Sequence, residues 1–366
     1  MPFSNGNILN LVLTKIIMVY IFNNYPNKGV TDYYLDIIAQ AVEKSGNNFA
    51  KVPFINHQSK GKLQLINTLL FKDFGYSFIS KKDWIVVANP SEVVNLYFHG
   101  YRNLILWIQG VAPEESYMNN HSKVSKTFLE IVEKLALKFS KFTFLVSNAM
   151  KRHYEQKYNF DFKENYYIMP CFNTQLDLSS FDYPNKYKTN VFTYVGSTAA
   201  WQCFKETVEL YKLVEEHLPN SLLKLYTGDY ELAEKTCREY GVRNYSINFV
   251  SAAQLSEELK SCKFGFVIRE DNVVNNVATP TKLSSYMASG VIPVFTSAIR
   301  DFTELTKDMK AVCHLRDFRD VSSLVKKSFD INSADVVRKE YIDFFDRVFN
   351  EQKYIDNIAE KIYFVS

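Results

Sequence analysis

The sequence predicts an α/β protein made of two domains, each built around a parallel β-sheet. The chain has 366 residues, more than the roughly 250–300 at which a single hydrophobic core stops growing. Short apolar runs alternate with helical patterns along most of the chain, which is typical of βαβ units. Hydrophobic residues make up 47% and charged residues 23%, as in ordinary globular proteins.

The second half of the chain shows this alternation most clearly. In the helical pattern over 203–218, Val208, Tyr211 and Val214 recur at the spacing that places them on one helix face. Further helices are expected over 231–240, 252–262 and about 280–289. Strands are expected over 191–196, 222–228, 245–250, 263–270 and 291–295. Strands and helices that alternate in this way form a parallel sheet with both faces covered.

The first half repeats the pattern less regularly. Strands are expected over 15–22, 84–90, 104–110 and 142–148, and helices over 31–44, 62–71, 91–98 and 122–139. Pro170 and the polar stretch 173–190 are typical of a linker. The expected division is a first domain over 1–172, the linker over 173–190, a second domain over 191–339 and a final helix over about 336–363.

Charge and cysteine content limit the classes of protein to which the chain can belong. Residues 1–175 hold 19 Lys and Arg against 13 Asp and Glu, a surplus too sparse for nucleic-acid binding. It is compatible with weak attraction to an anionic membrane surface, although ordinary scatter of charge would look the same. The five cysteines are scattered singly, which indicates neither a zinc site nor a disulfide framework and fits a reducing cytoplasm. Lys15 interrupts the apolar run over 8–22, so we expect neither a membrane span nor a signal peptide there.

Candidate ligand-binding residues follow the expected strands of the second half. In an open parallel sheet, ligands bind beyond the carboxyl ends of the strands. The residues at these positions are mostly small, which lets a ligand approach the backbone, although ordinary turns favour the same residue types. They are Gly196, Ser197, Thr227, Gly228 and Val250.

The segment 275–282 is expected to begin a helix at the same edge of the sheet. Thr279 is the expected N-cap and Pro280 the first helical residue. A helix N-terminus carries free N–H groups and partial positive charge, which favour a phosphate. Lys282 in the first turn would add charge to such a site; the alternative is an exposed lysine that tolerates its position.

Arg269 and Glu270 end the strand expected over 263–270. An arginine at this edge could clamp a phosphate through two hydrogen bonds. Glu270 could accept hydrogen bonds from sugar hydroxyls. The alternative is that Arg269 pairs with Glu270 or with another acid nearby.

The first half offers weaker candidates. Gly29 lies in the turn after the first strand and could admit a diphosphate against the helix start. Glu114 and Glu115 follow the strand that ends near Gln109, and paired acids can perform acid–base chemistry. Adjacent acids in a loop are more often simply solvated.

Two histidines of the first half are further candidates, and three motifs are absent from the sequence. His99 and His121 lie near the expected sheet edges, where either could be an ordinary surface residue. The patterns GxGxxG and Walker A are absent, which argues against dinucleotide dehydrogenases and P-loop NTPases. No acidic cluster suited to Mg²⁺ stands out. We therefore expect no metal and no cofactor.

Several longer motifs resemble those of the GT-B glycosyltransferases, specifically glycosyltransferase family 4. They are "VFTYVGS", "TPTKLSSYMASGVIPV", "LWIQGVAPEESYM" and "FLVSNAMKRHYEQKYNF", and the last two are similar to bacterial members that build surface polysaccharides. The resemblance implies two facing Rossmann-like domains with a cleft between them. It also implies that the C-terminal helix, about 340–366, crosses back to the first domain.

The resemblance further implies metal-independent sugar transfer with retention at the anomeric carbon. The second domain would hold the nucleotide-sugar donor, and the first domain the acceptor. The implied acceptor is a polysaccharide or a lipid-linked oligosaccharide, and the implied location is the cytoplasm, including the inner face of the cell membrane. The residues and the resemblance together give catalytic candidates Arg269, Lys282, Glu270 and Gln109, and donor-binding candidates Gly29, Gly196, Ser197, Gln202, Thr227, Gly228, Val250, Val277, Ala278, Thr279, Pro280 and Ser285. The acceptor-side candidates are His99, Glu114, Glu115 and His121.

The chain departs from the family pattern at the positions that normally hold the donor. Ser197 and Gln202 stand where the family has an arginine and a lysine. Val277 and Ser285 stand where it has two glutamates, and Gln109 where it has a histidine. Two hypotheses follow. In one, Arg269 and Lys282 supply the missing charge; in the other, the chain is a non-catalytic nucleotide-sugar-binding or scaffolding partner in polysaccharide assembly.

Overall fold

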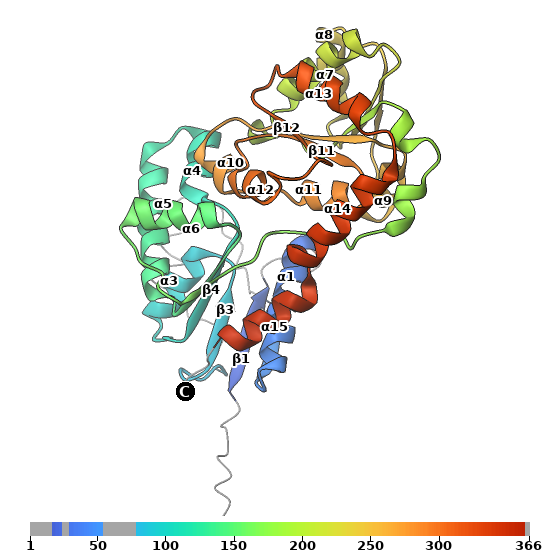
Figure 1. The fold of residues 1–366 in the computed structure, drawn as a ribbon. Helices are drawn as coiled ribbons and strands as arrows, with labels where there is room; N and C mark the ends of the chain where they lie inside the picture. The colour runs from blue at the N-terminus through green and yellow to red at the C-terminus, as the bar shows by residue number, and fades with distance from the viewer. Residues whose placement is uncertain (1–16, 24–28, 54–77, 363–366) are drawn as a thin grey trace, which may run out of the picture.

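A computed structural model describes residues 17–23, 29–53 and 78–362 of the chain (Figure 1). The helix expected over 62–71 and the first two residues of the strand expected over 15–22 lie outside this part. The described chain forms two α/β domains, each with one six-stranded sheet whose strands are all parallel. The predicted fold class is therefore confirmed. No helix among the described residues combines the length and apolar character needed to cross a bilayer.

The first sheet has the strand order β2-β1-β3-β4-β5-β6. Its strands are β1 (Met18–Asn23), β2 (Asn48–Pro53), β3 (Trp84–Val87), β4 (Leu104–Ile108), β5 (Phe142–Leu145) and β6 (Tyr166–Ile168). Its helices are α1 (Gly29–Lys44), α3 (Pro90–Phe98), α4 (Ala112–Asn120), α5 (Lys123–Phe139) and α6 (Asn148–Tyr158). Every residue of β3, β4 and β5 is buried, as expected for strands with helices on both faces.

The second sheet has the strand order β12-β11-β10-β7-β8-β9. Its strands are β7 (Val191–Val195), β8 (Leu222–Tyr226), β9 (Tyr245–Asn248), β10 (Phe264–Val267), β11 (Ile292–Thr296) and β12 (Cys313–Leu315). Its helices are α7 (Phe204–His217), α8 (Tyr230–Glu239), α9 (Ala252–Lys260), α10 (Val273–Val277), α11 (Thr281–Ala288), α12 (Arg300–Leu305) and α13 (Val321–Asp330). The elements β2, α4, α6, β6, α10, α12, β12 and α13 were not among those expected from the sequence.

The segment expected as a polar linker packs onto the second domain. It holds two short 3₁₀ helices, η1 (Leu178–Asp182) and η2 (Lys186–Lys188). Tyr187 is buried and donates a hydrogen bond to the carbonyl of Gly290. The Lys186 ammonium group is also buried and donates to the carbonyls of Ser180 and Ser289.

The C-terminal segment returns to the first domain, as predicted, but as two helices rather than one. Figure 1 shows α14 (Ala334–Arg347) beside the second domain and α15 (Glu351–Lys361) beside α1. Asn350 caps the N-terminus of α15 by accepting a hydrogen bond from the backbone N–H of Lys353. Tyr33 on α1 donates to Glu351 at 2.7 Å, which ties α15 to the first domain.

The carboxyl edges of the two sheets face each other and make direct contact. The Ser147 hydroxyl, after β5, donates to the carbonyl of Val277 at 2.7 Å. Asp301, at the start of α12, accepts from the backbone N–H groups of Asn148 at 2.5 Å and Ala149 at 2.8 Å. A buried carboxylate of the second domain therefore binds the N-terminus of α6 in the first domain.

Asp301→Ala is expected to lower the free energy of unfolding by about 1–3 kcal/mol, because two N–H groups at the partly buried start of α6 lose their acceptor. Urea denaturation measures this change. Glu304→Ala is the matched control, since Glu304 lies on the same helix in an exposed pair with Lys307 and such pairs contribute about 0–1 kcal/mol. Equal destabilisation by both changes would contradict the assigned role of Asp301.

Candidate functional site

The strand order of the second domain fixes where its ligand site lies. From β7 the chain proceeds outward through β8 to β9, then returns to add β10 on the other side of β7. The connections after β7 and β10 thus leave the sheet in opposite directions and open a crevice between them, where ligands bind in folds of this kind. Gly196 follows β7, and Arg269 follows β10 by two residues.

Position 196 requires a glycine for two reasons, its backbone conformation and the close approach of Lys282. Its φ is +120°, a conformation that side-chain-bearing residues rarely adopt. A Cβ added there would lie 2.8 Å from Cε of Lys282 and 3.0 Å from its Nζ. Lys282 therefore lies directly over the backbone of the turn after β7.

Arg269, Lys282 and Gln202 form the centre of the candidate site. The guanidinium of Arg269 is held by the carbonyls of Ile268 at 2.8 Å and Gln202 at 3.0 Å. The side-chain oxygen of Gln202, Oε1, accepts from Nη2 of Arg269 at 2.6 Å and from Nζ of Lys282 at 2.7 Å. Two cations from separate elements therefore converge on one oxygen atom.

This pair of cations has no acidic partner among the described residues. No carboxylate of these residues lies within 4.0 Å of Arg269 or Lys282. The Glu270 carboxylate is exposed and forms no ion pair with Arg269, so the alternative that it neutralises Arg269 is wrong. Lys282 is half-buried rather than exposed, with Nζ 4.3 Å from the ring centre of Tyr194.

Burial lowers the pKa of both cations, and repulsion from Arg269 lowers that of Lys282 further. Burial lowers the pKa of Arg269 from its ordinary value. Burial, followed by repulsion from Arg269, lowers the pKa of Lys282 well below its ordinary value. A bound anion would raise both pKa values again, because a nearby opposite charge stabilises the charged form of each side chain.

The helix expected at 280 begins one residue later than predicted. Pro280 is the N-cap, and α11 begins at Thr281. The side chain of Thr279 does not cap the helix, because its oxygen accepts from the backbone N–H of Cys171 at 3.1 Å. No side chain caps α11, so Lys282 in its first turn supplies the charge at this end.

Two positions aligned with the family's glutamates contact protein rather than an open site. The side chain of Val277 is buried against first-domain residues, and its carbonyl binds Ser147. The side chain and the carbonyl of Val277 are thus both engaged with the first domain, and its role as a donor-binding residue stays a prediction. Ser285 is buried and donates to the side-chain oxygen of Asn173 at 3.0 Å. Ala278 lies between these contacts as the C-cap of α10.

The remaining donor-side candidates lie along the carboxyl edge. Ser197 is exposed, and its carbonyl accepts from Tyr194 at 2.6 Å. Thr227 is buried and accepts from the N–H of Asp229, whereas Gly228 is exposed. Val250 precedes the helix start of α9. In the first domain, Gly29 is the first residue of α1 rather than part of the turn before it, because the helix begins two residues earlier than expected.

The acidic pair of the first domain begins a helix instead of lying in a solvated loop. The Glu115 carboxylate accepts from the N–H of Val111 at 3.1 Å, so it caps its own helix, and burial raises its pKa. A Cβ added to Gly110 would collide with this carboxylate. Glu114 pairs with Lys157 at 2.8 Å. Both acids therefore have partners within the first domain.

The three other first-domain candidates occupy different places. Gln109 is exposed directly after β4, at the edge that faces the second domain. His121 is exposed at the turn between α4 and α5, with φ at 53°. His99 ends α3, and its carbonyl accepts from Lys81, which precedes β3. The expectation that His99 lies at the carboxyl edge is wrong, because α3 has returned to the amino ends of the strands.

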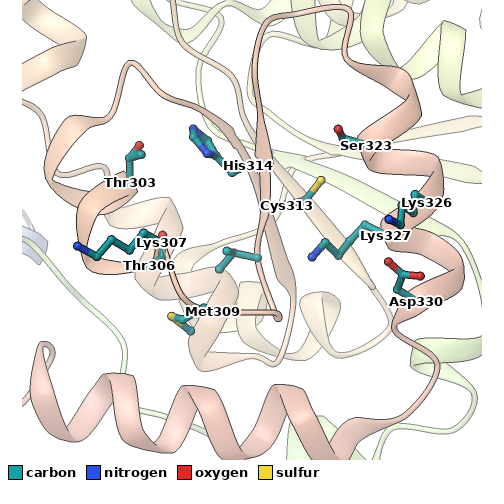
Figure 2. A pocket seen from close by; sticks show the side chains of 11 residues that line it. Thr303, Thr306, Lys307, Met309, Cys313, His314, Ser323, Lys326, Lys327 and Asp330 are labelled. Carbon is teal, nitrogen blue, oxygen red and sulfur yellow. The ribbon is translucent and has the colours of Figure 1, made fainter.

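A separate cavity of about 310 Å³ lies between α12, β12 and α13 (Figure 2). Lys307, Lys326 and Lys327 line it together with His314 and Asp330. It contains none of the candidate residues and lies at the edge strand, two strands from β10. The candidate site lies instead in the crevice after β7 and β10, which is the switch point of the sheet. There the side chains of Arg269, Gln202 and Lys282 hydrogen-bond to one another.

Comparison with known proteins identifies the fold. No protein-family model and no curated protein matches the sequence. The structure is similar to a glycosyltransferase from Rickettsia africae, with a TM-score of 0.67, 11% identity and coverage of 94% of this chain and 97% of that chain. It is also similar to Alr3699/HepE from Anabaena, solved with UDP and glucose, with a TM-score of 0.65, 12% identity and coverage of 94% and 98%.

A third similar structure is much longer than this chain. A mutant of S. aureus TarM, solved with fondaparinux, alpha-GlcNAc-glycerol and UDP, matches with a TM-score of 0.56 and 10% identity. The match covers 78% of this chain but only 56% of TarM. At such identities the likeness establishes the architecture: the chain has the GT-B fold of two Rossmann-like domains.

Proposed function

We propose that this chain transfers a sugar from a nucleoside-diphosphate sugar to a glycan acceptor, as a retaining glycosyltransferase. The observation that carries the proposal is the convergence of Arg269 and Lys282 at the switch point of the second domain, without an acidic partner among the described residues. The diphosphate of such a donor carries about two negative charges, which two cations can balance. Two structural neighbours, TarM and Alr3699/HepE, were solved with UDP, which supports this choice of ligand.

The two cations would act mainly on the leaving diphosphate. Charge accumulates on its oxygens as the bond to the sugar breaks, and fixed cations in a partly buried site stabilise that charge. Arg269 is already held in place by two backbone carbonyls. Lys282 is held over Gly196 by α11. Because the protein itself supplies two positive charges, the proposed reaction needs no metal ion.

The acceptor would approach from the first domain, across the facing carboxyl edges. Gln109 is exposed at this edge of the first domain, and Glu270 is exposed at the edge of the second. Both can exchange hydrogen bonds with sugar hydroxyls. We propose a growing polysaccharide or lipid-linked oligosaccharide as the acceptor, because two sequence motifs resemble those of bacterial enzymes that build surface polysaccharides.

Binding of UDP or another nucleoside diphosphate is expected to stabilise the chain in EDTA as strongly as in Mg²⁺. A ligand at about 100 times its dissociation constant adds about 2.7 kcal/mol to the free energy of unfolding, which a thermal-shift titration detects. Nucleosides without phosphate serve as the control and should have little effect. Stabilisation that requires Mg²⁺ would refute the metal-independent site.

A non-catalytic binding partner is the second candidate function. It is favoured by the contacts of Val277 and Ser285, which supply no carboxylate where the resemblance expects one. The two functions differ in turnover. Hydrolysis or transfer of a bound donor by the pure protein would exclude a purely binding role, whereas tight donor binding without turnover on any acceptor would support it.

A further inference from the structure

The side-chain amide of Gln202 lies between the two cations of the candidate site. Its oxygen accepts from Arg269 at 2.6 Å and from Lys282 at 2.7 Å. A neutral oxygen atom thus receives two charged donors that approach from different elements. Phosphate oxygens are commonly bound by arginine and lysine in the same manner.

We propose that Gln202 is a specificity-determining residue of this site, and that its amide oxygen holds the position a phosphate oxygen takes when a diphosphate binds. The proposal rests on the proposed function. A phosphate oxygen carries formal negative charge, whereas the amide oxygen of Gln202 carries only a partial one. Exchange of the amide for a phosphate is therefore favourable for both cations, and a weakly charged ligand cannot displace the amide as effectively.

The exchange requires only the side chain of Gln202 to rotate. Gln202 ends a short 3₁₀ helix, η3 (Ala200–Gln202), where its backbone N–H donates to Ala199 at 2.8 Å. Its backbone carbonyl accepts from Nη1 of Arg269, and this bond does not depend on the side chain. Arg269 therefore stays in place when the amide leaves.

The amide is held by few other contacts. Among the described residues, its only hydrogen-bond partners are Arg269 and Lys282, and both bonds involve the oxygen. The Gln202 side chain is half-buried, so the departing amide can reach water. Rotation then costs two hydrogen bonds, which the ligand replaces with two between opposite charges.

The opposite role is that Gln202 stays and orients the cations. Arg269 and Lys282 have further N–H donors that a ligand could use while the amide remains. The two roles predict opposite effects of removing the side chain. Gln202→Ala frees both cations if the amide is displaced by ligand, but leaves them disordered if the amide positions them.

Titration calorimetry with inorganic pyrophosphate and with UDP, both in EDTA, distinguishes these roles. Gln202→Ala is expected to bind both at least threefold more tightly than the wild-type chain. Gln202→Glu is expected to bind both at least tenfold more weakly, because its carboxylate neutralises the pair. Gln202→Glu should also unfold at a higher temperature, which shows that the variant is folded.

Gln156→Ala and Gln156→Glu are the matched controls, since Gln156 is exposed on α6 in the first domain. Both should bind like wild type. Unchanged or weaker binding by Gln202→Ala would overturn the proposal while leaving the diphosphate site intact. Absence of binding by the wild type and every variant would overturn the proposed function together with it.

Discussion

Replacing Lys282 by methionine is expected to reduce sugar transfer at least tenfold and, in the same variant, to stabilise the fold. Nζ of Lys282 and Nη2 of Arg269 share one acceptor oxygen, and no carboxylate among the described residues balances them. Tenfold corresponds to about 1.4 kcal/mol of transition-state stabilisation. The loss follows because the leaving diphosphate then meets one cation instead of two.

The gain in stability has the same physical origin. Burial and the charge of Arg269 both lower the pKa of Lys282, so the folded chain holds this ammonium group at a cost. Methionine keeps the packing over Gly196 and removes the charge. Replacement of buried charged groups by hydrophobic side chains of similar size often stabilises a protein by about 1–4 kcal/mol, and because Lys282 is half-buried we expect a gain at the lower end, about 1–2 kcal/mol. Loss of function with gain of stability is typical of a strained functional site.

Lys326→Met is the matched control for this experiment. Lys326 is exposed in the same domain, beside the cavity at β12, and its replacement removes the same single charge. Turnover and melting temperature should both stay near wild-type values. Wild-type turnover in Lys282→Met, or a lower melting temperature, would contradict the role assigned to Lys282.

The sequence predicts the interior strands well but misses three of the four edge strands, β2, β6 and β12. The strand β10 lies in the interior of the sheet, and helices cover both of its faces. Its residues therefore form a continuous apolar run that is easily recognised in the sequence. The edge strands β2 and β12 pair on one side only. Their segments, "NFAKVP" and "CHL", lack a sustained apolar run. Pairing with a neighbour, rather than local pattern, makes them strands.

The candidate site was predictable where it depends on topology. Alternation of strands and helices places Arg269 and the start of α11 at one edge of the sheet, and both lie there. The same rule shows why the expectation for His99 is wrong. A helix of nine residues after a strand rises about 13 Å, enough to return His99 to the opposite edge.

Contacts between distant segments were not predictable from the sequence. The pattern around Val277 does not reveal that its side chain is buried against the first domain. Asp301 gives no local signal either, because the N–H groups that it binds belong to α6. Gln202 was a donor-side candidate, but its contact with both cations depends on how η3 turns toward α11.

The wild-type chain is expected to gain up to about 5 kcal/mol in free energy of unfolding, relative to Lys186→Met, as the pH rises from about 7 toward 10. Burial lowers the pKa of Lys186 from 10.5 to about 7. A pKa difference of one between the folded and unfolded chain corresponds to about 1.4 kcal/mol. Lys186 donates to the carbonyls of Ser289 and Ser180 without a carboxylate within ion-pair distance among the described residues.

The direction of this change with pH follows from the number of protons that the folded and unfolded chains bind. Between pH 7 and 10.5 the unfolded chain keeps a proton on Lys186 that the folded chain has released. Stability therefore rises with pH across this window. Below about pH 7 Lys186 is charged in both states, and the full cost of burying that charge is present. The buried Lys263, whose pKa burial lowers to about 8, titrates equally in wild type and variant and cancels in the comparison.

Urea denaturation of wild type and Lys186→Met at pH 6.5, 8 and 9.5 measures this effect. The difference between the two free energies should change by several kcal/mol across the series, in favour of wild type at high pH. Lys188→Met is the control, because Lys188 is exposed on the same 3₁₀ helix and should show no such trend. A difference that stays constant with pH would show that Lys186 is charged throughout. The Ser289 carbonyl at the end of α11 would then hold an ammonium group. That helix would carry a buried positive charge at its C-terminus and the cation of Lys282 at its start.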